Sequence, residues 1–174
     1  MKENIKHLVC FDFDGTLIHT PLPEDGKKKW EEFYNMSFPR PGWWGAKESL
    51  DLKVFYPPVN DYVFKFYKEC FGKEDTYTFL ATGRLVKLET EVKKVLDLHN
   101  IKFDDIFCNN SGETLRFKKK LFEKKIEEFK NCESFTMFDD RYEHIQEFIE
   151  WSKQFKNVKV TVVDIVRKKT YTNF

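Results

Sequence analysis

The 174-residue sequence has no long hydrophobic run. None of its stretches approaches the ~20 apolar residues that a membrane-spanning helix needs, so a membrane protein is not expected. The opening segment, Met1 to Lys6, also lacks the apolar region of a secretory signal and leads directly into the first apolar run. We therefore expect a cytoplasmic protein without membrane contacts.

Cysteine is scarce, and the four cysteines form no Cys-x-x-Cys pair. Cys10, Cys108 and Cys132 lie within or beside apolar, strand-like runs, and Cys70 lies in a helix-like stretch. Widely separated cysteines in such surroundings are typical of buried thiols in a reducing compartment, and less so of disulfides or a zinc site. We expect no disulfide partner.

An excess of either charge is also missing. Lysine and arginine total 30 against 29 acidic residues, which gives a formal net charge of +1. Overall charge therefore neither favours nor excludes a nucleic-acid partner, and only local clusters could do so. Aromatic residues make up 17% of the chain, so a chain of this length can fill one sizeable core. We expect a single domain over residues 1–174.

Proline is absent from most of the sequence. All six prolines lie between residues 21 and 58, inside a segment, about 19–75, that lacks the strand-and-helix rhythm of the rest. We interpret 19–75 as a cap-like insertion of irregular loops and short helices after the first strand. It also holds three of the four tryptophans, Trp30, Trp43 and Trp44.

The aromatic residues of this insertion allow two interpretations. They can form a small core of their own beneath the insertion, which we favour for most of them. They can instead cover a site and offer ring faces on which a base or a sugar stacks. Trp43 and Trp44 are candidates for this second role, because adjacent residues of an extended backbone point in opposite directions.

The sequence Asp12-Phe13-Asp14-Gly15-Thr16-Leu17 follows the apolar run His7 to Phe11. If that run is a buried strand, the two aspartates lie on the same side at its carboxyl end. Gly15 permits a sharp exit that brings the second carboxylate over the first. Such a pair suits a hard cation and a phosphate, with Asp12 attacking phosphorus, Asp14 transferring a proton and Mg²⁺ offsetting the charges. A strand followed by an ordinary Asp-Gly turn is the plainer alternative.

Two further stretches place polar residues where strands are expected to end. Thr82-Gly83-Arg84 follows the run Tyr77 to Ala81. A hydroxyl there can donate to a phosphate oxygen, although an N-cap threonine would look the same. Asp139-Asp140-Arg141 follows the run Ser134 to Phe138, and two carboxylates beside Asp12 would complete an oxygen cage for Mg²⁺.

A basic run, Arg116 to Lys120, occupies the first turns of a helix that is expected to open at Thr114. Most of these side chains are expected in solvent. Lys118 lies next to the apolar stripe of the helix, from where an ammonium group can neutralise an aspartyl nucleophile and a transferring phosphoryl group. Lys119 and Lys120 compete with it for this role.

Strands and helices alternate along the rest of the chain. We expect strands at about 7–11, 77–81, 105–108, 134–138 and 158–163, with the last of these ending the sheet, and helices at about 60–71, 85–98, 114–129 and 145–151. This order predicts an α/β fold, a Rossmann-like doubly wound parallel sheet with helices on both faces. Ligands of such folds bind outside the carboxyl ends of the strands, where Asp12, Asp14, Thr82 and Asp139 fall.

Taken in this order, the motifs resemble those of the haloacid dehalogenase (HAD) superfamily. Asp12 to Leu17, Thr82, Lys118 and the pair Asp139-Asp140 stand at its four motif positions. The resemblance implies a phosphatase in which Asp12 forms an aspartyl phosphate, Asp14 acts as general acid and base, and Thr82 and Lys118 hold the phosphoryl group. It also implies that Mg²⁺ is bound by Asp12, the backbone carbonyl of Asp14, and Asp139 or Asp140.

Residues next to these motifs complete the candidate site. We expect substrate contacts from Thr16, Gly83, Arg84, Trp43, Trp44 and Arg141. The arginines can hold phosphate by bidentate hydrogen bonds, and the alternative for each is an ion pair with a nearby acid. His144 could support the Asp139-Asp140 pair, although a packing or surface role is the expectation for a lone histidine on a first helical turn.

Several stretches are more narrowly similar to the HAD domain of the Swiss Army Knife RNA repair proteins. They include Thr20-Pro21, Gly42-Trp43-Trp44, Glu48-Ser49-Leu50-Asp51, Phe103-Asp104 and Thr114 with Phe117-Lys118. This resemblance implies an end-repair enzyme, a Mg²⁺-dependent phosphomonoesterase that removes a 3′-terminal phosphate from RNA or DNA. The alternatives are a phosphatase for small metabolites such as nucleotides or sugar phosphates, and a non-catalytic module that binds phosphorylated ends or a protein.

Overall fold

The computed structural model describes residues 4–110 and 112–174; residues 1–3 of the opening segment lie outside this part. The sheet has the order β3-β2-β1-β4-β5-β6. Its strands are β1 (His7–Phe11), β2 (Thr76–Leu85), β3 (Asp105–Asn109), β4 (Ser134–Asp139), β5 (Lys159–Asp164) and β6 (Lys169–Thr172). Strands β1 to β5 pair in parallel, and β6 pairs antiparallel with β5. The expected α/β fold with a Rossmann-like sheet is confirmed.

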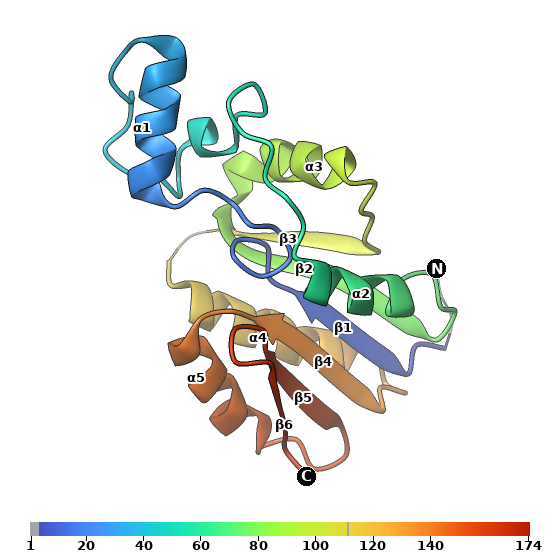
Figure 1. Ribbon diagram of the computed structural model, residues 1–174. Coiled ribbons are helices and arrows are strands. Elements are labelled where there is room, and N and C mark those ends of the chain that lie inside the picture. The colour runs from blue at the N-terminus through green and yellow to red at the C-terminus, as the bar shows by residue number, and fades with distance from the viewer. Residues whose placement is uncertain (1–3, 111) are drawn as a thin grey trace.

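Helices cover both faces of the sheet (Figure 1). They are α2 (Asp61–Cys70) and α3 (Glu89–Leu98) on one face, and α4 (Thr114–Glu128) and α5 (Tyr142–Ser152) on the other. The first core includes Phe11, Val63, Leu80, Val92 and Leu96. The second includes Leu8, Cys10, Phe122, Phe135 and Phe148. Strand β1 feeds both cores because its side chains alternate between the two faces.

The expectation that the sheet ends with residues 158–163 is wrong, because β6 adds a further strand. Strand β6 has only four residues, Lys169–Thr172, and three of them are exposed. It carries no apolar run that would predict a strand. A short connection that contains Lys168 in the left-handed region, with φ of 52°, folds it back against β5.

Strand β2 runs further than the sequence predicts. Its last residue is Leu85, so Thr82-Gly83-Arg84 belongs to the strand and does not begin a helix. The pairing of β2 with β3 shifts between Thr82 and Leu85, which is an irregularity of the β-bulge kind. There the Oγ1 of Thr82 accepts a hydrogen bond of 3.1 Å from the backbone N–H of Arg84 and so satisfies a donor at the interruption.

The segment between β1 and α2 contains the helix α1 (Pro23–Tyr34) and the 3₁₀ turn η1 (Lys47–Leu50). Helix α1 lies beyond the carboxyl ends of the strands, away from the sheet (Figure 1). It has 12 residues, and Pro23 lies in its first turn, where its missing N–H needs no partner. Trp30, Trp43, Val54 and Phe55 form a separate hydrophobic cluster in this segment.

None of the helices described is both long enough and apolar enough to cross a membrane.

Candidate active site

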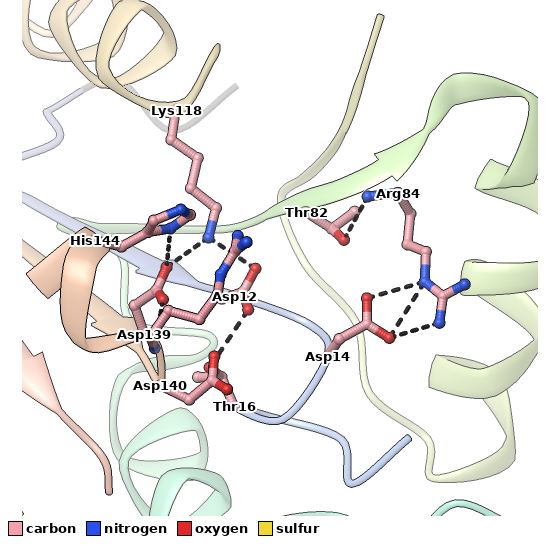
Figure 2. Close-up of polar contacts among 10 residues, drawn as sticks. Asp12, Asp14, Thr16, Thr82, Arg84, Lys118, Asp139, Asp140 and His144 are labelled. Atoms are coloured by element: carbon pink, nitrogen blue, oxygen red, sulfur yellow. Dashed lines mark hydrogen bonds and ion pairs between the residues drawn. The ribbon is translucent and has the colours of Figure 1, made fainter. Parts of the chain in front are cut away.

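The carboxyl ends of β1, β2 and β4 bring the sequence motifs to one edge of the sheet. Phe11 of β1 pairs in parallel register with Phe138 of β4. Asp12 and Asp139 therefore follow at neighbouring strand ends and lie side by side. The first turns of α4 approach the same edge and place Lys118 over both aspartates (Figure 2).

Lys118 is buried and bridges the two strands. Its Nζ donates to Asp12 Oδ1 at 2.7 Å and to Asp139 Oδ2 at 2.6 Å. Burial opposes the charged form, but the two carboxylates outweigh it and raise the pKa of Lys118. By contrast, Lys119 pairs with Glu147 near the surface and Lys120 is exposed. Geometry therefore distinguishes Lys118 from its two neighbours, which the sequence could not.

Three carboxylates share this corner. Asp12, Asp139 and Asp140 each offer an oxygen, and these oxygens all lie within 4.8 Å of one another. Burial raises the pKa of Asp12 to about 7; Lys118 opposes this shift, and the charges of Asp139 and Asp140 add to it. Burial acts on Asp139 in the same direction, but Lys118 and His144 outweigh it and lower its pKa. Burial and the charge of Asp139 raise the pKa of Asp140.

The three carboxylates fit a hard divalent cation. The Lys118 ammonium pairs with Asp12 and Asp139 but not with Asp140, so three carboxylates share a single bridging ammonium group. All the candidate ligand atoms are oxygens, which suits Mg²⁺ better than a soft metal. Thr16 supports the arrangement, because its Oγ1 donates to Asp140 Oδ1 at 3.2 Å and to Asp12 Oδ2 at 3.4 Å.

Asp14 faces away from this cluster and toward Arg84 (Figure 2). The Nε of Arg84 donates to Asp14 Oδ2 at 2.9 Å, and its Nη2 donates to Asp14 Oδ1 at 2.8 Å. Thr20 Oγ1 donates to Asp14 Oδ1 at 2.7 Å. The remaining guanidinium nitrogen, Nη1, donates to the Trp44 carbonyl at 2.8 Å and to Ser49 Oγ at 2.6 Å. Arg84 thus joins Asp14 to the segment before α2.

A cavity of about 340 Å³ opens over these groups. Asp12, Asp14, Asp140 and the two arginines of the motifs, Arg84 and Arg141, contribute its polar wall. Leu22 and Trp44 contribute an apolar rim, and they are 64% and 44% exposed. The cavity therefore combines an acidic corner with an apolar mouth, and it can hold a phosphate ester whose organic part reaches the rim.

The sequence from 31 to 174 matches a family described as HAD domain family 1 in Swiss Army Knife RNA repair proteins. The chain belongs to this HAD family. The expected relation to the HAD superfamily is thereby confirmed. The match begins after the first motif, so Asp12 and Asp14 join the site through their place at the end of β1.

Solved structures share the fold of this HAD domain at low identity. A chain of the Pnkp1/Rnl/Hen1 complex is 18% identical with a TM-score of 0.60, and the match covers 98% of this chain but 48% of that chain. This chain therefore spans about half the length of that relative. A haloacid dehalogenase-like hydrolase from Streptococcus pneumoniae is 12% identical with a TM-score of 0.54, and the match covers 92% of this chain and 84% of that chain. The archaeal beta-phosphoglucomutase from Pyrococcus sp. strain ST 04 is 16% identical with a TM-score of 0.52, and the match covers 94% of this chain and 88% of that chain.

The two adjacent tryptophans of this HAD domain lie in different places. Trp43 is only 3% exposed, packs in the cluster around Trp30, and donates from its Nε1 to the Pro21 carbonyl at 2.9 Å. It does not line the cavity, whereas Trp44 does. The guanidinium carbon of Arg84 lies 5.0 Å from the centre of the Trp44 ring, which suits a cation–π contact.

Other expected site residues lie at or below the cavity floor. Gly83 lines the cavity, and a Cβ at this position would lie 2.7 Å from Thr114 Oγ1, so a side chain would collide with the start of α4. Thr82 is fully buried beneath it. His144 is buried with its Nδ1 3.6 Å from Asp139 Oδ2, an ion-pair distance that is too long for a hydrogen bond.

The site also contains residues that sequence reasoning did not assign to it. Thr20 donates a hydrogen bond to Asp14, and Ser49 accepts one from Arg84. Leu22 and Thr114 line the cavity. Thr20 and Ser49 stand in stretches that carry the family resemblance, which was a usable signal. The sequence around Leu22 gave no such signal, because one exposed leucine between two prolines is common in loops.

Proposed function

We propose that this HAD domain is a Mg²⁺-dependent phosphomonoesterase that acts through an aspartyl phosphate on the 3′-terminal phosphate of a nucleic acid. The observation that carries the proposal is the buried bridge from Lys118 to Asp12 and Asp139 at the base of an open cavity. A buried ammonium group that bridges two carboxylates, with a third carboxylate beside them, suits the binding of a phosphoryl group together with a divalent cation.

Asp12 is placed to be the nucleophile. Its Oδ1 is engaged by Lys118, whereas its Oδ2 accepts only a 3.4 Å contact from Thr16 among the described residues. In the first step Asp12 Oδ2 forms a bond to phosphorus and the bond from phosphorus to the ester oxygen breaks. The leaving oxygen takes a proton from Asp14. The Lys118 ammonium stabilises the charge that the phosphoryl oxygens carry in the transition state.

The second step regenerates the carboxylate of Asp12. A water attacks phosphorus and passes a proton to Asp14, the bond from Asp12 Oδ2 to phosphorus breaks, and inorganic phosphate leaves. Arg84 and Thr20 hold Asp14 at the cavity wall, turned away from Asp12 (Figure 2), and both transfers need its carboxyl group to turn toward phosphorus. Mg²⁺, held by Asp12, Asp139 and Asp140, would supply further electrostatic stabilisation of the phosphoryl oxygens.

Two observations support a nucleic-acid end as the substrate. The matching family is described from RNA repair proteins, and one solved structure with this fold is the Pnkp1/Rnl/Hen1 RNA repair complex. The exposed Trp44 also lines the cavity that holds Asp12 and Asp140, where a base or sugar attached to the phosphate would reach its ring.

The experiment measures phosphate release from a 3′-phosphorylated oligonucleotide, its 5′-phosphorylated counterpart and a panel of small phosphate esters, with Mg²⁺ and with a chelator. Asp12→Asn keeps the size of the side chain and removes the nucleophilic carboxylate. Asp97→Asn is the matched control, because Asp97 is exposed on α3. We expect release from the 3′ end in the presence of Mg²⁺, retained by the control and lost in Asp12→Asn.

Each other outcome corrects a defined part of the proposal. Turnover in Asp12→Asn would remove Asp12 as the nucleophile. Release from small esters alone would keep the chemistry and reject the nucleic-acid substrate. No release from any substrate would favour a module that binds phosphorylated ends without catalysis.

A further inference from the structure

A second cavity lies next to the active-site cavity and has a volume of about 390 Å³. On one side it is lined by the loop around Trp44, with Arg40, Gly42, Gly45 and Lys47. On the other side it is lined by Lys87 and Leu88 of the 3₁₀ turn η2 (Val86–Leu88) and by Glu91 of α3. We refer to this cavity, lined by Arg40, Lys47, Lys87 and Glu91, as the basic recess.

The basic recess carries an excess of positive charge. Arg40, Lys47 and Lys87 are exposed, and within residues 4–110 and 112–174 none of them forms an ion pair. Glu91 is the one acidic residue in the lining, so the recess has an excess of two positive charges. Cations gathered around a concave surface attract anions more strongly than the same cations spread over a flat one.

The basic recess begins where the active-site cavity ends. Trp44 lines the active-site cavity and its neighbour Gly45 lines the recess; adjacent Cα atoms are about 3.8 Å apart. On the opposite wall, Arg84 lines the first cavity and Lys87 lines the second. Three residues of chain span at most about 11 Å. A ligand longer than one nucleotide can therefore occupy both cavities at once.

The loop wall between the two cavities is open to a polymer backbone. A Cβ added to Gly42 or to Gly45 would meet no atom within 4 Å, so both positions face free space. Trp44, next to Gly45 in this loop, lines the active-site cavity and is 44% exposed. Proteins hold single-stranded nucleic acid without sequence preference by two features. One is a row of cations along the phosphate backbone, and the other is an aromatic ring on which a base can stack.

From this arrangement we propose that the basic recess binds the backbone phosphates of the nucleotides that precede the 3′ end, so that the enzyme prefers a single strand to a mononucleotide. The inference rests on the proposed function and names the part of the substrate that the active-site cavity does not hold. A small phosphorylated metabolite fills the first cavity and leaves the recess unused. Arg40, Lys47 and Lys87 thus become determinants of substrate length.

The test compares kcat/KM for a 3′-phosphorylated hexanucleotide with kcat/KM for a 3′-mononucleotide. The variant Arg40→Gln, Lys47→Gln, Lys87→Gln removes the three cations of the recess. The control Lys130→Gln, Lys156→Gln, Lys159→Gln removes the same charge from exposed positions near the amino ends of β4 and β5.

We expect the recess variant to lower the ratio of oligonucleotide to mononucleotide kcat/KM by roughly tenfold, and the control to keep it. In the recess variant, the dependence of log kcat/KM on log salt concentration for the oligonucleotide should become shallower by about 0.7 for each lost phosphate contact. An unchanged ratio, or an equal fall in the control, would overturn the proposal.

The two proposals can fail separately. Hydrolysis of the 3′-mononucleotide tests the active site alone, so its absence together with absence of oligonucleotide hydrolysis would reject the proposed function. The recess would then be judged by binding of a fluorescent 3′-phosphorylated hexanucleotide to the unaltered protein and to both triple variants. Weaker binding in the recess variant alone supports the proposal, and equal binding in all three proteins, or no binding, overturns it.

Discussion

Replacement of Arg84 by methionine should destabilise the protein and disorganise Asp14. Arg84 is 2% exposed, and its guanidinium donates to Asp14, Ser49 and the Trp44 carbonyl. Methionine fills similar volume but donates nothing. Removal of one member of a buried ion pair costs about 3–5 kcal/mol. Because the Asp14 side chain is 20% exposed, water screens part of the loss, and we expect about 3 kcal/mol.

A double-mutant cycle with Asp14→Asn isolates the interaction. Urea unfolding of the two single variants and the double variant should give a coupling energy of about 1–2 kcal/mol, because the two side chains share their hydrogen bonds. The single Arg84→Met change should lower Tm by roughly 6–12 °C at this chain length. Arg116→Met, at an exposed position of α4, is the control and should stay within about 0.5 kcal/mol of the parent.

The cycle can also refute this assignment. Additive effects, with a coupling energy below about 0.3 kcal/mol, would show that Arg84 does not hold Asp14 in solution. A kcat for Arg84→Met equal to that of the parent would show that the orientation of Asp14 does not limit turnover. Either result would require another role for the most buried arginine of the site.

Three further changes test other parts of the structure. Lys118→Met should lower kcat in a phosphate-release assay by at least about 100-fold, because it removes charge stabilisation of the transition state. Lys119→Met should leave kcat within about twofold of the parent. Equal effects of the two variants would contradict the choice of Lys118 as the active-site lysine. Gly26→Ala should destabilise the protein by about 1–3 kcal/mol in urea unfolding, because the added Cβ would lie 2.3 Å from Trp43 Cζ2. An unchanged urea midpoint would show that the Trp43 ring moves aside. Mg²⁺ at about 100 times its Kd should stabilise the native state by about 2.7 kcal/mol and raise Tm by roughly 5–11 °C in differential scanning fluorimetry. The Asp140→Asn variant should lose most of this rise in Tm. A rise of the same size in Asp140→Asn would exclude Asp140 as a Mg²⁺ ligand.

The positions of Asp12 and Asp139 could be predicted from the sequence because each follows an apolar run that reads as a buried strand. In a parallel sheet the carboxyl ends of such strands meet at one edge, so local patterns alone bring these residues together. The same reasoning predicted the order of the alternating elements. It failed for β6, whose four mostly exposed residues carry no burial pattern.

The partners of Arg84 could not be predicted, because they depend on contacts between distant segments. Ser49 lies 35 residues away in the chain and Trp44 lies 40 away. The irregular end of β2 that turns the guanidinium toward Asp14 has no sequence signature beyond one glycine. Lys118 was the candidate because it lies beside the apolar stripe of a helix that was expected to open at Thr114, but Lys119 and Lys120 remained alternatives, because only the packing of α4 against the sheet shows which ammonium group reaches the aspartates.

The bond from Arg84 to Trp44 is made to a backbone carbonyl, and every amino acid supplies that group. The residue at position 44 can therefore be exchanged without removing the hydrogen bond that ties the loop to Arg84 and, through Arg84, to Asp14. Its side chain lines the cavity, and an exchange there would remove the contact between the Trp44 ring and the Arg84 guanidinium. Under the proposed function, this arrangement would separate the contact with the substrate from the hydrogen bond that holds Arg84 and Asp14, and position 44 would be the place to retarget the domain toward another phosphate ester.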